Sequence, residues 1–122
     1  MAGILLVEDN EDLRAMLKES LEKRKHRIIE ASNGKEALIR FKSAVTDIVI
    51  TDLIMPEQDG IGLIMELKKI KPEIKVVAIS GGGKIGPSNY LDIAETLGAD
   101  AVFPKPFNLN SFILEVEKLV EI

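Results

Sequence analysis

The sequence predicts one α/β domain in which a parallel sheet carries helices on both faces. Short apolar segments alternate five times with longer amphipathic segments along the 122 residues, and this alternation is typical of parallel sheets. The length suits a single domain, residues 1–122, with its own core. Hydrophobic residues make up 46% of the chain and charged residues 30%, the balance of an ordinary globular protein.

The first part of the chain contains two strand–helix pairs. "GILLV" (3–7) is apolar throughout and predicts a buried strand. Residues 11–24 carry apolar side chains at helical spacing with charges between them, which predicts an amphipathic helix. "HRIIEA" (26–31) predicts a second strand, and the helix over 34–43 follows with Asn33 placed as its N-cap.

The middle of the chain repeats the pattern. "DIVIT" (47–51) predicts the third strand, since its residues are mostly β-branched and apolar. A helix over 61–70 follows Gly60 and stops before Pro72. "KVVAIS" (75–80) predicts the fourth strand.

The last part of the chain completes five pairs. A helix is expected over 89–98, a short strand over 101–104 ("AVFP"), and a final helix over 109–122. Asn108 or Asn110 is placed to cap the final helix.

Composition excludes several classes of protein. The chain has no cysteine and one histidine, His26, so disulfides, thiolate metal sites and histidine-cluster metal sites are excluded. The formal net charge of −4 does not favour direct nucleic-acid binding. No apolar run approaches the roughly 20 residues of a membrane span, and the N-terminus lacks the basic region of a signal peptide. We therefore expect a cytoplasmic protein that binds neither nucleic acid nor membrane.

Polar side chains gather where the predicted strands end. Ligands of open parallel sheets bind beyond the carboxyl ends of the strands, so these positions are the candidates for chemistry. They are Glu8 and Asp9 after the first strand, Asp52 after the third, Ser80 after the fourth and Lys105 after the fifth. The end of the second strand, residues 30–32, offers nothing obvious.

These residue types indicate phosphoryl chemistry. Three carboxylates close together repel one another and need a cation at neutral pH. A small cluster of oxygen ligands suits a hard divalent ion such as Mg²⁺, which often binds beside a phosphate. A lysine and a hydroxyl can hold phosphoryl oxygens. The interpretation is that Asp52 is the nucleophile and forms an aspartyl phosphate.

At this point the chain resembles the receiver domains of two-component response regulators, in particular chemotaxis-type receivers. The motifs that carry the resemblance are "LLVEDNED", "DLIMPEQDG", "AISGG" and "PKPF", in the expected order over essentially the whole chain. The resemblance implies a doubly wound, flavodoxin-like fold with five parallel strands in the order 2-1-3-4-5 and five helices.

The resemblance also implies a metal site and a phosphoacceptor. Asp52 corresponds to the phosphoacceptor. Asp9 corresponds to a direct Mg²⁺ ligand, and Glu8 to the residue that holds metal-bound water. The backbone carbonyl of Ile54 would complete the site.

The switch residues follow from the same resemblance. Ser80 corresponds to the hydroxyl that turns toward the phosphoryl group, beside the backbone of Gly81. Lys105 corresponds to the lysine that pairs with that group, and the bond from Lys105 to Pro106 is expected to be cis. Val102 stands three residues before this lysine, where the family often has a Tyr or Phe that swings inward on activation.

Phe103 does not replace the aromatic switch residue, because strand alternation points Phe103 to the face opposite Val102.

Two further positions depart from the family's usual pattern. The positions two after the phosphoacceptor and two after the hydroxyl often carry polar side chains that orient the hydrolytic water; here they are Ile54 and Gly82. We therefore expect slow self-dephosphorylation.

The function implied is a phosphorylation-controlled binding module. A sensor histidine kinase or a histidine phosphotransfer protein would donate the phosphoryl group, and the protein would catalyse only its own phosphorylation and dephosphorylation. An effector would read the surface made by the fourth helix, fifth strand and fifth helix. The protein would act alone or as one domain of a larger chain.

Three other functions fit these residues less well. A haloacid-dehalogenase-type phosphatase also forms an aspartyl phosphate, but it needs a second acid at the position of Ile54. A flavin-binding module on the same topology needs a phosphate cradle after the first strand, where "EDNED" would repel a phosphate. "SGGGK" (80–84) lacks the spacing of a P-loop, and no Ser or Thr follows Lys84.

Overall fold

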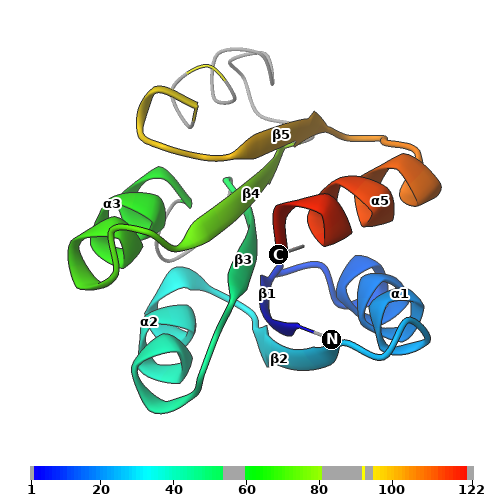
Figure 1. The fold of residues 1–122 in the computed structure, drawn as a ribbon, viewed down its shortest axis with the longest axis horizontal. Coiled ribbons are helices and arrows are strands. Elements are labelled where there is room, and N and C mark those ends of the chain that lie inside the picture. The colour runs from blue at the N-terminus through cyan, green and yellow to red at the C-terminus, as the bar shows by residue number, and fades with distance from the viewer. Residues whose placement is uncertain (1, 54–59, 81–91, 93–94, 121–122) are drawn as a thin grey trace.

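The computed structural model describes residues 2–53, 60–80, 92 and 95–120. Five parallel strands form one sheet in the order β2-β1-β3-β4-β5 (Figure 1). This order and the parallel sheet confirm the predicted flavodoxin-like architecture. The strands are β1 (Gly3–Val7), β2 (Arg27–Ala31), β3 (Ile48–Asp52), β4 (Lys75–Ser80) and β5 (Ala101–Pro104).

The described residues hold four helices rather than the five that were predicted. They are α1 (Glu11–Glu22), α2 (Gly34–Ser43), α3 (Gly60–Ile70) and α5 (Leu109–Val120). The other predicted helix, over 89–98, lies largely outside the described residues, which is why no bounds can be given for it. Within that segment Asp92, Glu95 and Thr96 are helical.

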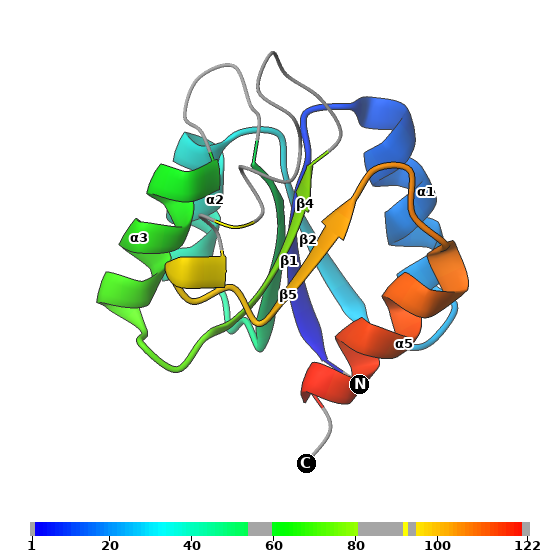
Figure 2. The same cartoon turned by 90° about the horizontal axis from the view of Figure 1, so that it is seen from above.

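The helices lie in two layers, one on each face of the sheet. Figure 2 shows α2 and α3 on one face and α1 and α5 on the other. All five strands run in one direction, so their carboxyl ends meet at one edge of the sheet. Parallel connections of this kind are almost always right-handed, and they distribute the helices over both faces.

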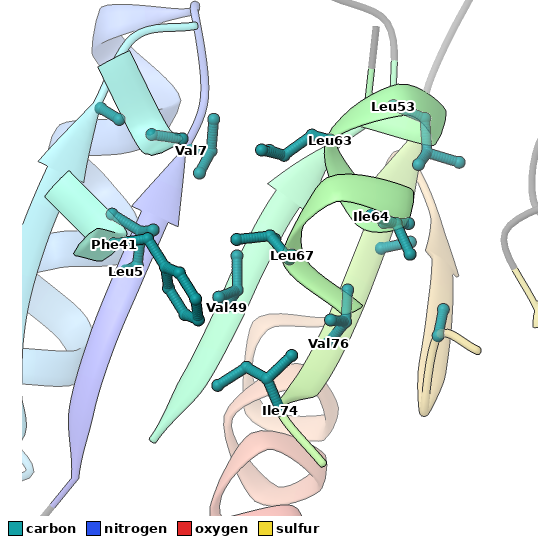
Figure 3. Packing of buried hydrophobic residues seen from close by; sticks show 14 residues of the cluster. Leu5, Val7, Phe41, Val49, Leu53, Leu63, Ile64, Leu67, Ile74 and Val76 are labelled. Atoms are coloured by element: carbon teal, nitrogen blue, oxygen red, sulfur yellow. The ribbon is translucent and has the colours of Figure 1, made fainter. Parts of the chain in front are cut away.

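Strand alternation divides the core into two clusters. In β3, Val49 packs toward α2 and α3, whereas Ile48 and Ile50 pack toward α1 and α5. Figure 3 shows the cluster under α2 and α3, where Phe41 and Leu67 approach the strand residues. Because helices cover both faces, the central strands β1, β3 and β4 are almost continuously buried, as in other parallel sheets.

Side-chain caps fix where three of the helices begin. The Asn33 side chain accepts a hydrogen bond from the backbone of Glu36 at 2.8 Å, as the sequence predicted. Asn108, rather than Asn110, caps α5 by accepting from the backbone of Ser111 at 2.9 Å. Asn10 caps α1 in the same way, which the sequence analysis did not anticipate. Each cap satisfies a backbone donor that the helix itself leaves unpaired.

Three aromatic rings join β5 to α5. Phe112 is fully buried, and its ring centroid lies 5.1 Å from that of Phe103 and 4.7 Å from that of Phe107. Phe103 packs toward α1 and α5, whereas Val102 packs toward the opposite cluster. The structure thus confirms that Phe103 and Val102 face opposite sides of the sheet.

We expect Phe112→Ala to lower the free energy of unfolding by about 3–5 kcal/mol, because it leaves a cavity where the other two rings lose their partner. Leu114→Ala on the same helix is the control. The Leu114 side chain is 61% exposed, so its truncation should change stability by less than about 0.5 kcal/mol. Urea unfolding of both variants measures the difference; equal effects would contradict the packing described.

Candidate functional site

The register of the sheet places two buried carboxylates side by side. Val7 of β1 lies opposite Thr51 of β3. One residue further along the same register, Glu8 and Asp52 follow on neighbouring strands, on the face that points toward α1 and α5. Glu8 is 0% exposed and Asp52 is 4% exposed. Two carboxylates in this position need compensation by positive charge or by donors.

Lys105 supplies positive charge to both carboxylates. Its Nζ donates a hydrogen bond to Asp52 Oδ2 at 2.8 Å and forms an ion pair with Glu8 Oε1 at 3.1 Å. The backbone N–H of Lys105 donates to the carbonyl of Ser80 at 2.8 Å, which anchors the lysine at the end of β4. The Lys105–Pro106 peptide bond is cis, the isomer that the resemblance implied.

The turn after β1 orients the Glu8 carboxylate. Glu8 Oε2 accepts a hydrogen bond from the backbone N–H of Asn10 at 3.1 Å. Glu8 Oε1 is buried, and no described group donates a well-directed hydrogen bond to it despite the nearby ammonium of Lys105. The turn therefore fixes Oε2 of Glu8, whereas Oε1 can still accept a hydrogen bond or bind a cation.

The electrostatics of the site favour a bound cation. Burial, followed by the charge of Asp52, raises the pKa of Glu8 to about 7 from its usual 4.5. Burial by itself lowers the pKa of Lys105, but the hydrogen bond to Asp52 and the negative charges of Asp52 and Glu8 outweigh this effect and raise it. The ammonium of Lys105 thus leaves a cost for the charged form of Glu8, and a metal ion beside this carboxylate would reduce that cost.

Asp9 completes a set of three carboxylates. One oxygen from each of Glu8, Asp9 and Asp52 lies within 4.8 Å of the others, and Asp9 is the exposed member. Oxygen ligands only, one open side and an incompletely satisfied Glu8 oxygen fit a hard divalent cation that keeps several waters, as Mg²⁺ does. The predicted acidic ligands therefore converge.

Ser80 ends β4 with a buried hydroxyl. Ser80 is 0% exposed, and its Oγ has no hydrogen-bond partner among the described residues. A buried hydroxyl without a partner is costly, so a ligand oxygen at this edge of the sheet would relieve it. Two other predicted positions, Ile54 and Gly81, lie outside the described residues.

Gly60 allows α3 to begin directly against the end of β3. A Cβ at this position would lie 2.3 Å from the carbonyl oxygen of Asp52 and 2.6 Å from the Cα of Leu53. Only glycine permits this approach without a shift of the backbone that carries Asp52.

The sequence analysis missed two residues that border the site. Arg14 Nη1 donates to the backbone carbonyl of Glu8 at 2.7 Å, and Arg14 Nε donates to Glu30 Oε1 at 3.2 Å. Glu30 stands at the end of β2, where the sequence suggested no chemistry. No spacing rule links the two, because they are 16 residues apart and meet only when β2 pairs with β1.

A family model and several curated proteins match this chain. The family model described as "Response regulator receiver domain" matches residues 4–117. The response regulator receiver protein CpdR of Brucella abortus is 34% identical over 121 residues, covering 98% of each chain. The sensor kinase CckA of the same organism is 37% identical over 125 residues, covering 98% of this chain but 13% of the kinase.

A solved structure shows the same fold. The response regulator protein TrrA of Thermotoga maritima, in complex with Mg²⁺-BeF, matches with a TM-score of 0.85 and 34% identity. The match covers 98% of this chain and 99% of that one.

We expect Mg²⁺ affinity to rise roughly tenfold between about pH 6 and about pH 8, since Glu8 with a pKa of about 7 must lose its proton to meet a cation. The pKa of Glu8 in the folded chain lies above the unfolded value of 4.5. Between pH 4.5 and about pH 7, the metal-free folded chain therefore binds more protons than the unfolded chain. Its free energy of unfolding should therefore fall as pH rises through this range, and Mg²⁺ should reverse the loss.

Titration calorimetry at several pH values tests this expectation, with Glu8→Gln as the matched variant. Glutamine does not titrate, so the variant should bind Mg²⁺ more weakly and with a flat pH profile. A variant that kept the wild-type pH dependence would show that another group controls cation binding.

Proposed function

Since the chain belongs to the response regulator receiver domain family of two-component systems, we propose that it accepts a phosphoryl group on Asp52. The observation that carries this proposal is the 2.8 Å bond from Lys105 Nζ to Asp52 Oδ2 inside a cluster of three carboxylates. Receiver domains are phosphoaccepting signalling modules, and we propose that this one catalyses only its own phosphorylation and dephosphorylation.

Asp52 acts as the nucleophile. One carboxylate oxygen attacks the phosphorus of a phosphohistidine, an O–P bond forms, and the P–N bond breaks with its electron pair going to the leaving imidazole. The attack needs no general base, because a carboxylate nucleophile has no proton to lose as the O–P bond forms. Its position at the end of β3, 4% exposed, limits the approach of water.

The remaining residues hold the charge of the transferred group. When bound, Mg²⁺ would stabilise the negative charge that develops on the phosphoryl oxygens. Glu8, Asp9 and Asp52 would hold it, together with the backbone carbonyl of Ile54, which the family resemblance adds. Lys105 would pair with a phosphoryl oxygen from the other side.

Ser80 and Gly81 would respond to phosphorylation of Asp52. The buried hydroxyl of Ser80, which has no partner among the described residues, is placed to donate to a phosphoryl oxygen. Its movement would bias the surface formed by the expected helix over 89–98 together with β5 and α5, and an effector would read this surface. Since Val102 stands where the family often has an aromatic switch residue, the Ser80 hydroxyl would be the main switch group.

The donor is proposed to be a sensor histidine kinase or a histidine phosphotransfer protein. This agrees with the match to a receiver segment within the kinase CckA. Among the described residues, no helix is both long enough and apolar enough to cross a bilayer. A cytoplasmic location, a single domain over 1–122 and the absence of nucleic-acid binding stay predictions from the sequence.

We expect the protein to gain one phosphoryl group from acetyl phosphate in the presence of Mg²⁺, and Asp52→Asn to gain none, because an amide is not a nucleophile here. Intact-mass measurement detects the gain. Asp12→Asn removes an exposed carboxylate from the first turn of α1 and serves as the control, which should be modified like the wild type. Full modification of Asp52→Asn would place the acceptor elsewhere.

We expect the phosphorylated form to persist for minutes or longer, because neither Ile54 nor Gly82 offers a polar side chain to orient an attacking water. Ile54→Asn should shorten this lifetime by supplying such a side chain. Loss of phosphate is followed by intact mass after removal of the donor. A wild-type half-life of seconds would contradict the expectation.

A further inference from the structure

The backbone of Glu8 is held on both sides. β1 ends at Val7, so Glu8 lies one residue beyond it, and its N–H donates to the carbonyl of Ala31 at 3.1 Å. The Glu8 carbonyl accepts from Arg14 Nη1 at 2.7 Å, a short, charge-assisted bond. Since this carbonyl belongs to the peptide unit that joins Glu8 to Asp9, the bond fixes the plane from which Asp9 leaves the chain.

The guanidinium of Arg14 is itself oriented. Its Nε donates to Glu30 Oε1 at 3.2 Å, and the other oxygen, Glu30 Oε2, lies 3.4 Å from Lys18 Nζ. The Arg14 side chain is 17% exposed and the Glu30 side chain 38% exposed. The planar fork of arginine can make both bonds at once, which a lysine ammonium on a flexible stem does less well.

We propose that Arg14, oriented by Glu30, is a positioning residue for cation binding: it holds the Glu8 carbonyl and so sets the placement of the Glu8 and Asp9 carboxylates. This inference rests on the proposed function, since it concerns the same Mg²⁺ site. Partners that orient metal ligands in this way typically contribute 10- to 100-fold to metal affinity, so a loss of about 10-fold is expected on removing Arg14.

A simple charge effect makes the opposite prediction. Arg14 brings a positive charge close to three carboxylates, and a cation nearby weakens the binding of a second cation. If Arg14 acted only through its charge, Arg14→Gln would tighten Mg²⁺ binding. If Arg14 acts by holding the peptide, the same substitution weakens binding. The sign of the change therefore separates the two roles.

The experiment is a Mg²⁺ titration of the whole chain, followed by the backbone amide signals in ¹H–¹⁵N NMR spectra. Arg14→Gln should bind Mg²⁺ about 10-fold more weakly than the wild type, and the Asp9 amide signal should shift already in the metal-free spectrum. Arg14→Lys keeps the charge but not the fork, so it should recover part of the affinity. A wild-type affinity in Arg14→Gln, or a tighter one, would overturn the proposal.

Lys18→Gln is the matched control. It removes the same charge from the same helix and also loses a contact with Glu30, but within the described part of the chain Lys18 makes no bond to Glu8. Its Mg²⁺ affinity should equal that of the wild type or rise slightly. A 10-fold loss in Lys18→Gln would also overturn the proposal, because it would show that general disruption of α1 is enough.

A double-mutant cycle tests the role of Glu30. Glu30→Ala should weaken Mg²⁺ binding in the wild type. It should have little further effect in Arg14→Gln, since either change removes the oriented guanidinium that holds the Glu8 carbonyl. Additive losses would overturn the part assigned to Glu30. Urea unfolding of each variant checks that the chain is folded. If the wild type itself bound no Mg²⁺, the proposed function would fail first and this inference with it.

Discussion

The pairing of one lysine with two buried carboxylates is the interaction on which the site depends. Lys105 reaches Asp52 Oδ2 at 2.8 Å and Glu8 Oε1 at 3.1 Å, across strands that are not consecutive in the sequence. Buried carboxylates are tolerated only when they are paired. Here Glu8 Oε1 accepts no well-directed hydrogen bond from the described residues, and burial, followed by the charge of Asp52, raises the pKa of Glu8 to about 7. The three carboxylates converge at the position of the acidic pocket where receiver domains bind Mg²⁺.

The scaffold places these groups by ordinary packing rather than by special local structure. Both faces of the sheet are buried, so side-chain alternation along each strand is enforced up to its last residue. By this alternation, Glu8 and Asp52 point to the same face of the sheet as Leu6 and Ile50. Phe103 points to the face opposite Val102. The same constraint that builds the core therefore aims the carboxylates toward each other and directs the aromatic ring away from the usual switch position.

Much of the fold and most of the site could be predicted because both are encoded by local pattern. The five strands, the parallel order and the acids at the strand ends follow from periodicity and from family motifs. The helix bounds were less accurate: the first helix ends at Glu22 rather than at residue 24, because the backbone N–H groups of Arg24 and Lys25 donate to the carbonyls three residues earlier instead of four. Asn10 was not predicted as a cap, because it lies within the acidic run "EDNED", whose residues also suit a metal site.

The sequence by itself determined which residues are available at the carboxyl edge of the sheet, because burial fixes periodicity and periodicity is visible in one dimension. Only the tertiary structure decided which atoms meet. The neighbouring places of Glu8 and Asp52 depend on the register of β1 with β3. The bond from Arg14 of α1 to Glu30 of β2 likewise depends on the tertiary contact between these two elements. Such contacts join residues far apart in the chain, and their geometry is set by strand pairing and helix docking, which no spacing in the sequence records.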